Sequence, residues 1–328
     1  MKNKWLRDAL LDRGDRLVVS VSGGKDSTSI CLWLMEQGLK PDDYDRVFAD
    51  TGWELPSVYE YVRGPLTERV GPITEVRHEQ PKPFEPDVEA LAQKYEARLG
   101  VEHSSMIRLV LQHAGFPSRL MRFCTRSLKI APIAAWLKSR DFEPVCVVGI
   151  RAQESSRRAE MPEWEWSDTH DAYVWRPIIG WTFQDVIDIH KRNNMRPAAP
   201  YFAGADRVGC APCIFARKSE LKWLADVHPD RMSLLGDLER DVSALKRARN
   251  LSKGKDPPKY PATWFFNKQP PMRDGKIASD THGYVPVWNI EQVIEWAKGS
   301  VNQVELFAGR KTDHGCMRWG FCDTSNQK

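Results

Sequence analysis

RLVVSVS, residues 16–22, runs directly into GGKDS, residues 23–27, and this junction decides the fold. The first stretch is a short, β-branched apolar run that ends in small residues, which predicts a buried parallel strand. The stretch STSICLWLMEQG, residues 27–38, predicts a helix that Gly38 closes. A strand, a glycine turn and a helix therefore follow one another without a break.

The same order of elements repeats further along the chain. Apolar runs at 44–49 and 143–150 predict strands. Helical patterns accompany them at 55–62, 129–139 and 181–193. Strands and helices that alternate at this spacing indicate parallel strands joined by crossover helices.

The character of the chain changes near residue 203. A cysteine pair is followed by a charged helical stretch at 218–251, a linker rich in Lys, Pro and Gly, and a tail with a helix expected at 290–298. We therefore expect two domains. The first is a doubly wound, mostly parallel α/β domain over residues 1–202, and the second is a smaller, mainly helical, metal-binding region over residues 203–328.

Composition and charge are those of an ordinary globular protein. The 328 residues are 41% hydrophobic and 28% charged, and the formal net charge of +4 permits contact with nucleic acid without arguing for it. No run approaches the ~20 apolar residues of a membrane span, and the charged residues 1–14 lack the apolar segment of a signal peptide. The seven cysteines favour metal binding or catalysis over a disulfide framework. We expect a cytoplasmic protein without a membrane partner.

The glycine turn has the chemistry of a phosphate-binding loop. Glycines let the backbone approach a ligand, and amide groups at the start of a helix suit a polyphosphate. It is not a Walker A loop, because Asp26 follows Lys25 and Val19 occupies the position of the first glycine. The alternative is a tight turn whose glycines serve only packing. The residues expected to bind a ligand here are Ser20, Ser22, Gly23, Gly24, Lys25, Asp26 and Ser27.

Two further loops should meet this one at the same edge of the sheet. Residues 50–52 and 151–158 also follow predicted strands, and ligands of doubly wound sheets bind outside the carboxyl ends of the strands. Arginines there can neutralise a polyphosphate and stabilise charge during phosphoryl or adenylyl transfer. The residues expected to join the site are Asp50, Thr51, Gly52, Gly149, Arg151, Glu154, Arg157 and Arg158.

Three acidic residues of these loops have more than one interpretation. Asp26 is a magnesium ligand or the N-cap of its helix. Asp50 binds the nucleotide or a metal, or it caps the helix that follows. Glu154 orients an arginine or holds magnesium, or it forms a structural ion pair.

The loop SGGKDS (22–27) resembles the PP-loop of ATP pyrophosphatases and of the phosphoadenosine phosphosulfate (PAPS) reductase superfamily. Further segments resemble the same superfamily in the same order: DTGWELP (50–56) with Tyr59, CTRSLK (124–129), GIRAQESSRR (149–158), WRPI (175–178) and YFAGADRVGCAPC (201–213). The resemblance covers about residues 17–215. The member type it is most similar to is the sulfur-activating ATP pyrophosphatase of DNA phosphorothioation.

The resemblance implies a fold of the adenine nucleotide α-hydrolase type and an enzyme that uses ATP, or adenylyl sulfate (APS) or PAPS, with Mg²⁺. Its catalytic residues would be Lys25, Asp26, Arg151 and Arg157. Such an enzyme adenylates an acceptor oxygen and releases pyrophosphate, so that sulfur can replace the oxygen. DNA or tRNA would be the acceptor, and a protein such as a cysteine desulfurase would donate the sulfur.

Cys210-Ala211-Pro212-Cys213 has the form of a metal-binding knuckle. The resemblance places the segment of Cys124 beside this knuckle, and the tail adds Cys316 and Cys322. Four thiolates suit a [4Fe–4S] cluster or zinc, and the use of [4Fe–4S] by related reductases and DNA-sulfur enzymes favours the cluster. The expected ligands are Cys124, Cys210, Cys213 and Cys322, with Cys316 as the reserve ligand or a sulfur-handling thiol.

The remaining cysteines, Cys31 and Cys146, lie in an apolar helix and strand and are expected in the core.

Two departures from the iron–sulfur reductases separate the alternatives for function. Those enzymes carry a tandem Cys-Cys where this chain has Phe123-Cys124, and a C-terminal Glu-Cys-Gly-x-His motif where this chain has His314-Gly315-Cys316. Sulfonucleotide reduction, with a C-terminal cysteine as nucleophile and sulfite as product, is therefore the second hypothesis. The third is a non-catalytic member that binds nucleic acid through the tail aromatic and basic residues Lys259, Tyr260, Trp264, Phe265, Phe266 and Lys268, which would stack on bases or pack a small domain.

Overall fold

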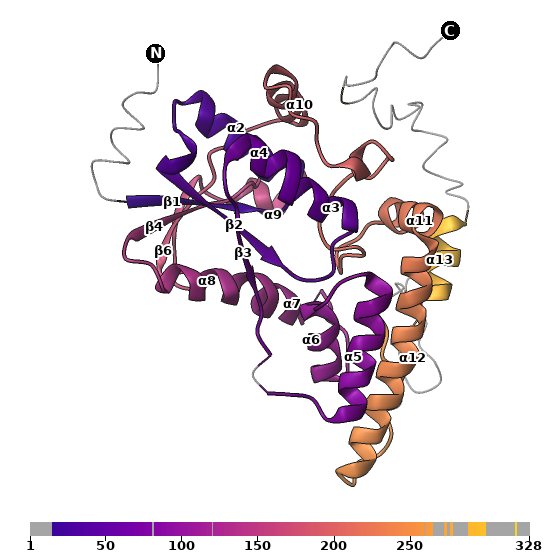
Figure 1. Cartoon of the computed structure of the whole chain (residues 1–328). Helices are drawn as coiled ribbons and strands as arrows, with labels where there is room; N and C mark the ends of the chain where they lie inside the picture. Colours follow the sequence, from indigo (N-terminus) through magenta and orange to yellow (C-terminus); the bar gives the residue numbers. More distant parts are fainter. Residues whose placement is uncertain are drawn as a thin grey trace. The chain divides into compact units, whose positions relative to one another are not determined.

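The computed structural model describes residues 15–80, 82–119, 121–258, 260–264, 272–273, 276–277, 288–299 and 319. Contacts divide the chain into two compact units, each built from separate stretches of sequence (Figure 1). Among the residues described, the first unit holds 15–78, 126–211 and Trp319, and the second holds most of 79–125 and of 212–299. The domain boundary expected at residue 202 stays a prediction.

A six-stranded sheet forms the centre of the first unit, with the strand order β3-β2-β1-β4-β6-β5. All neighbouring strands are parallel except β5 and β6, which pair antiparallel. The strands are β1 (Asp15–Val21), β2 (Tyr44–Asp50), β3 (Thr74–Arg77), β4 (Glu143–Val147), β5 (Trp164–Ser167) and β6 (Ala172–Trp175). The mostly parallel α/β fold is therefore confirmed, whereas the sequence patterns above do not predict the antiparallel edge strand β5.

Helices cover both faces of this sheet (Figure 1). The α-helices of the unit are α2 (Lys25–Glu36), α3 (Pro56–Tyr61), α4 (Thr67–Val70), α8 (Ala131–Lys138), α9 (Ser156–Ala159) and α10 (Phe183–Arg192). Short 3₁₀ or π turns lie at Pro41–Asp43, Val62–Leu66, Arg126–Ile130, Ala152–Glu154 and Ala199–Tyr201. The arrangement holds the carboxyl ends of β1, β2 and β4 side by side at one edge.

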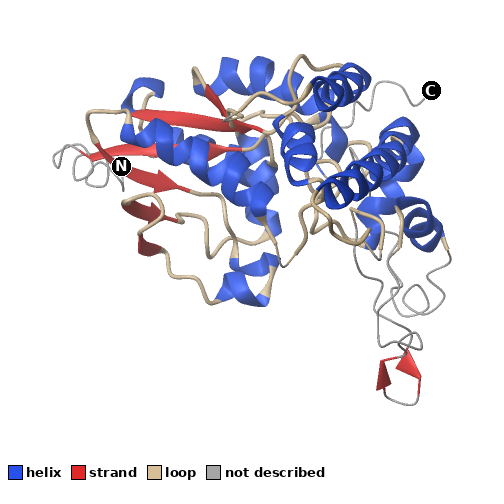
Figure 2. Cartoon of the chain, turned by 90° about the horizontal axis from the view of Figure 1, so that it is seen from below, coloured by secondary structure: helices blue, strands red, loops and turns tan. Residues whose placement is uncertain are grey.

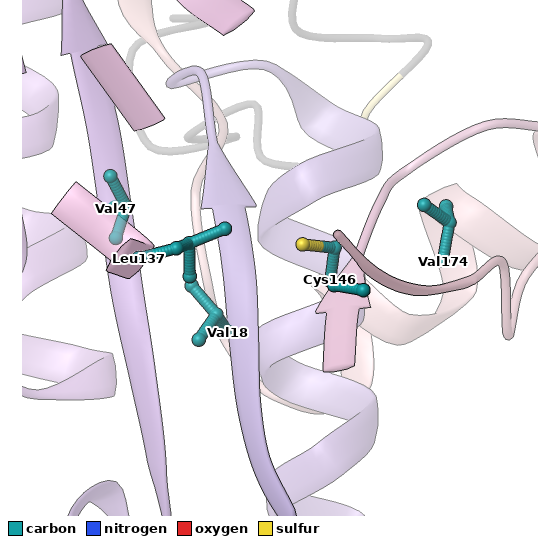
Figure 3. Close-up of a cluster of buried hydrophobic side chains, with 6 residues drawn as sticks. Val18, Val47, Leu137, Cys146 and Val174 are labelled. Carbon is teal, nitrogen blue, oxygen red and sulfur yellow. The ribbon is translucent and has the colours of Figure 1, made fainter. Parts of the chain in front are cut away.

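Helix α8 packs against the sheet through a cluster of apolar side chains. Leu137 of α8 packs with Val18, Val47, Cys146 and Val174, which come from four neighbouring strands (Figure 3). The strand residues that alternate with these are buried as well, because Leu17 and Val19 of β1 are 2% and 0% exposed. Burial of both faces is typical of a parallel sheet with helices on each side, and it explains the continuous apolar runs in the sequence.

The second unit is mainly helical (Figure 2). Its elements are α5 (Pro86–Leu99), α6 (Ser105–His113), the short α7 (Phe123–Thr125), α11 (Lys218–Val227), α12 (Pro229–Ser252), α13 (Ile290–Lys298) and the strands β7 (Met272–Arg273) and β8 (Lys276–Ile277). The helix expected at 290–298 is confirmed. The helical stretch expected at 218–251 is two helices, because Pro229 begins a new one after His228.

Helices α5 and α12 are joined by ion pairs and by packing. Arg98 contacts Asp237 at 2.6 Å, and Lys94 contacts Asp241 at 2.8 Å.

Trp264 is only 1% exposed and packs edge-on against Phe116. Trp264 therefore belongs to the core of this unit, and its suggested stacking on bases is wrong. Lys259, Phe265, Phe266 and Lys268 lie outside the described residues.

No helix among the described residues is both long enough and apolar enough to cross a membrane.

A buried carboxylate lies in the second unit. Glu239 of α12 is 4% exposed and accepts hydrogen bonds from the backbone amides of Trp264 (2.7 Å) and Ile290 (2.8 Å). Burial raises the pKa of Glu239 to about 7, although the two amide donors act in the opposite direction. The folded protein therefore keeps a proton on Glu239 in a pH range where the unfolded chain has released it.

This proton gives the first prediction. The free energy of unfolding should fall as the pH rises from 4.5 to about 7, and Glu239→Gln should remove this contribution, which is at most about 3 kcal/mol. Urea unfolding of both proteins across that pH range measures it. Glu295→Gln, on the exposed face of α13, is the control. An unchanged pH dependence in Glu239→Gln would contradict the assignment.

Candidate functional site

The loop between β1 and α2 has its backbone amides at the start of a helix. Gly24 is the N-cap of α2 with an extended backbone, and Gly23 has a φ of +68°. A Cβ on Gly23 would lie 2.9 Å from side-chain carbons of Val58 and Val62, so only glycine fits this turn. The interpretation of Asp26 as the N-cap is wrong, because Gly24 holds that position and Asp26 lies in the first turn.

Serine hydroxyl groups fix the shape of the loop. Ser27 Oγ accepts a hydrogen bond from the Ser22 amide at 3.2 Å and donates to the Gly24 carbonyl at 3.1 Å. The Ser22 and Ser27 hydroxyl oxygens lie 3.2 Å apart. Ser22 is exposed and Ser27 is buried, while Ser20 is half-buried within β1. The loop is therefore held in one conformation by its own side chains.

Two buried cations meet at Asp26. Arg151 Nε donates to Asp26 Oδ1 at 2.5 Å, and Lys25 Nζ lies 3.5 Å from Asp26 Oδ2. Lys25 is 7% exposed and Arg151 is 4% exposed. The loop after β4 thus reaches the loop after β1, as the strand order requires. Two fixed positive charges beside the start of a helix are suited to an anion.

The approach of the two loops depends on Gly149. A Cβ on Gly149 would lie 2.9 Å from the backbone carbon of Asp26 and from the backbone nitrogen of Ser27. Such a contact is shorter than a side chain tolerates, so the absence of a side chain at 149 is what lets Arg151 reach Asp26.

Lys25 is surrounded by groups that keep it charged. Its ammonium group lies 3.3 Å from the Asp206 carbonyl and over the rings of Tyr201 (5.2 Å) and Phe183 (5.8 Å). Burial acts to lower the pKa of Lys25, but Tyr201 and Asp26 raise it above its ordinary value. The site therefore carries this positive charge at neutral pH.

Residues distant in sequence form hydrogen bonds with the backbone of the loop between β1 and α2. Tyr201 Oη accepts a hydrogen bond from the Lys25 amide at 3.1 Å. The buried His190 places Nε2 3.1 Å from the Lys25 carbonyl and Nδ1 2.8 Å from the Met195 carbonyl. Trp319 contacts the rings of Phe183, His190 and Tyr201. The sequence patterns do not identify His190 or Trp319, although Tyr201 begins the segment quoted above.

The loop after β2 holds two buried carboxylates around Tyr59. Tyr59 Oη lies 2.9 Å from both Asp50 Oδ1 and Glu54 Oε2. Thr51 donates to Glu54 at 2.7 Å, and Asp50 also accepts from the Gly52 amide and from Arg77. Gly52 has a φ of +65°. Leu55 is the N-cap of α3, so the interpretation of Asp50 as a cap is wrong.

The loop after β4 contains a second, more exposed ion pair. Glu154 accepts a hydrogen bond from the Arg151 amide at 3.0 Å and pairs with Arg158. Arg157 is exposed on α9. Glu154 thus positions the backbone of Arg151, which agrees with its interpretation as an orienting or structural ion-pair residue.

The cysteines of the knuckle are fixed by different neighbours. Cys210 forms a backbone bridge with Glu54, and its sulfur lies 3.6 Å from Glu54 Oε1 and 3.9 Å from Thr51 Oγ1. Cys213 Sγ accepts from the Phe215 amide at 3.5 Å. The first cysteine of the knuckle is therefore tied to the loop after β2.

The segment of Cys124 lies beside the segment that follows Cys213. Arg119 Nε donates to the Ile214 carbonyl at 3.3 Å, and the Arg122 guanidinium lies 5.8 Å from the centroid of the Phe215 ring. Within the described parts of the chain, no three His, Cys, Asp or Glu side chains are grouped as metal ligands. Cys316 and Cys322 lie outside those parts.

Cys31 and Cys146 are core residues, as expected. They are 0% and 4% exposed, and burial raises the pKa of the Cys31 thiol to about 12 and that of Cys146 to about 11.

Comparison of this chain with known proteins identifies its family. A model of the phosphoadenosine phosphosulfate reductase domain matches residues 16–216. A 37.8 kDa protein of Escherichia phage 186, itself uncharacterised, is 33% identical over 262 residues, which are 71% of this chain and 77% of the phage protein.

Two further known proteins match a smaller part of this chain than the phage protein does. The adenosine 5′-phosphosulfate reductase of Allochromatium vinosum is 28% identical over 90 residues, which are 27% of this chain and 34% of that enzyme. Among solved structures, the PAPS reductase of Candida auris in a phosphate complex has a TM-score of 0.43 and 17% identity, and the match covers 63% of this chain and 89% of that one.

The Tyr59 contacts give the second prediction. Burial and the neighbouring carboxylates raise the pKa of Tyr59 far above its usual range, so the phenol stays a donor. Tyr59→Phe removes a donor that two buried carboxylates share and should lower the free energy of unfolding by roughly 1–3 kcal/mol. Urea unfolding checks this, with the exposed Tyr173→Phe as control. Equal stability of the two variants would refute it.

Proposed function

The chain belongs to the phosphoadenosine phosphosulfate reductase domain family, and on that premise we propose that it is an ATP pyrophosphatase that activates an acceptor for sulfur incorporation. The observation that carries the proposal is the pair of buried cations, Lys25 and Arg151, held on Asp26 at the glycine loop. An adenine nucleotide of the kind this family uses brings an anionic phosphate chain that such a pair can hold.

The residues have separate roles in this proposal. The loop at residues 22–27 and the ammonium group of Lys25 hold the phosphate groups that leave, and Arg151 stabilises the charge that develops on them. Arg157 and Arg158 add positive charge from the same loop, and Gly149 permits its approach. Asp50, Thr51 and Gly52 complete the nucleotide site from the loop after β2.

The proposed reaction has two steps. An acceptor oxygen attacks the α-phosphorus of ATP, the bond from that phosphorus to the bridging oxygen of the β-phosphate breaks, and pyrophosphate leaves with the electron pair. A sulfur nucleophile supplied by a donor protein then displaces AMP from the acceptor. The acceptor we propose is nucleic acid, as in DNA phosphorothioation, with tRNA as the neighbouring case.

Magnesium fits the donor set at the loop. Mg²⁺ is commonly bound by one or two carboxylates together with substrate phosphates, and Asp26 offers one carboxylate beside the loop amides. When bound, Mg²⁺ would neutralise charge on the phosphate oxygens. Asp26 would then release part of its hold on Lys25 and Arg151, which become available to the nucleotide.

A metal centre in the C-terminal region is also part of the proposal. Cys210 and Cys213 form the knuckle, Cys124 lies on a segment next to the one after Cys213, and Cys322 is the fourth ligand we propose, with Cys316 in reserve. A [4Fe–4S] cluster, or zinc, would organise this region or handle sulfur.

Pyrophosphate release tests the proposed activity. Purified protein given ATP, Mg²⁺ and an oligonucleotide acceptor should release pyrophosphate, and Lys25→Ala and Asp26→Ala should lose most of that activity because the buried charge pair is broken. Lys191→Ala, an exposed lysine of α10, should keep it. The proposal would be refuted if protein with its metal centre intact showed no ATP binding and no ATP turnover.

Sulfonucleotide reduction remains the second candidate, because the matching family model and the Allochromatium enzyme are named for it. That reaction predicts sulfite release from APS or PAPS, with thiol consumed and a thiosulfonate formed on Cys316 or Cys322. Mass spectrometry of protein treated with either substrate separates the two chemistries. Nucleotide binding without either product would instead indicate a non-catalytic member.

Metal analysis gives a separate prediction. Anaerobically purified protein should contain iron and sulfide and show the broad visible absorption of a thiolate-bound cluster, and Cys210→Ser and Cys213→Ser should lose it. Cys31→Ser, in the core, is the matched control. Stoichiometric zinc without iron would favour zinc as the bound metal. Protein that contained neither iron nor zinc would contradict the proposed metal centre.

A further inference from the structure

The second unit carries an exposed aromatic ring that two arginines contact. Phe215 is 40% exposed, although it is a large apolar residue. The guanidinium carbons of Arg119 and Arg122 lie 5.9 and 5.8 Å from the centroid of its ring. Arg119 is also fixed to the neighbouring backbone through the Ile214 carbonyl.

These arginines differ from others in the same unit. Arg98, Arg108 and Arg240 each form an ion pair with a carboxylate. Arg119 and Arg122 are exposed, and neither pairs with a carboxylate anywhere in the described part of the chain. Their positive charge is therefore available to an anion from outside the protein.

Phe215 is only partly buried. An exposed cation–π contact stabilises a fold only weakly, and a polar residue would serve better at a solvated surface. An exposed aromatic ring with two guanidinium groups beside it is a combination that binds a nucleobase and the phosphates next to it.

We infer that Phe215, Arg119 and Arg122 form a binding site for single-stranded nucleic acid, with one base stacked on Phe215 and the phosphates on either side of that base bound by the two arginines. Two cations around one ring match a nucleotide within a chain, which has a phosphate on each side, rather than a free mononucleotide. The inference deepens the proposed function and rests on it for the role of the strand as acceptor.

The position of this site in the sequence is consistent with that role. Arg122 lies two residues before Cys124, and Phe215 lies two residues after Cys213. A strand held there would lie against the two segments that carry Cys124 and Cys213, two of the proposed metal ligands.

The test is fluorescence anisotropy with the full chain, a labelled thymidine oligomer and no ATP. Phe215→Ala should weaken binding about tenfold or more, and Phe215→Trp should restore it because stacking is retained. Arg119→Gln with Arg122→Gln should weaken binding and reduce the slope of log affinity against log salt by about 1 to 2. Thermal melting checks that the variants fold.

A matched double variant separates this site from general electrostatics. Lys253→Gln with Lys255→Gln removes the same charge from the same unit, at the end of α12. This helix has 24 residues and is therefore about 36 Å long. The control should change affinity much less than the arginine variant.

Several outcomes would overturn the inference. The inference fails if the unaltered protein does not bind the oligomer, or if Phe215→Ala binds it as tightly as the unaltered protein does. It also fails if the lysine double variant weakens binding as much as the arginine double variant, or if a free thymidine mononucleotide competes fully at the affinity of the oligomer. Lys25→Ala should bind the oligomer normally. Absence of pyrophosphate release from the unaltered protein, with strand binding intact, would therefore reject the proposed activity and leave this site standing.

Discussion

The contact on which the rest of the site depends is the sharing of one carboxylate between two buried cations. Asp26 balances Lys25 and Arg151, and each of these charges would be costly to bury alone. The contact also joins the turn after β1 to the turn after β4. It therefore sets the distance between the loops and keeps both cations at the sheet edge before a ligand arrives.

The other parts of the site follow from the parallel sheet. Because β1, β2 and β4 are neighbours that run in one direction, the segments after them emerge together. Tyr59 holds the loop after β2 by its contacts with Asp50 and Glu54. Glu54 in turn fixes Cys210, so the first thiol of the knuckle is connected to the same edge.

Local sequence patterns were sufficient for β1, β2 and β4 and for the loops that follow them, because both depend on residues close in the chain. They failed where the partner is distant: Tyr201 contacts the amide of Lys25 across 176 residues. Asp26 looked like a helix cap because its side chain is suited to that role, but the extended backbone of Gly24 takes it. Helix α5 did carry signals, since Pro86 begins it and Gly100 follows its end, yet its apolar pattern is weak beside its charged residues.

The close approach at Gly149 has a consequence for how descendants of this protein can diverge. A methyl group there would meet the backbone of Asp26 and Ser27, whereas one at Gly180 would meet nothing within 4 Å. A side chain is therefore expected to be tolerated less well at Gly149 than at Gly180. A lineage that substitutes the first must also rebuild the neighbouring turn, while drift at the second leaves the ligand-facing architecture as it was.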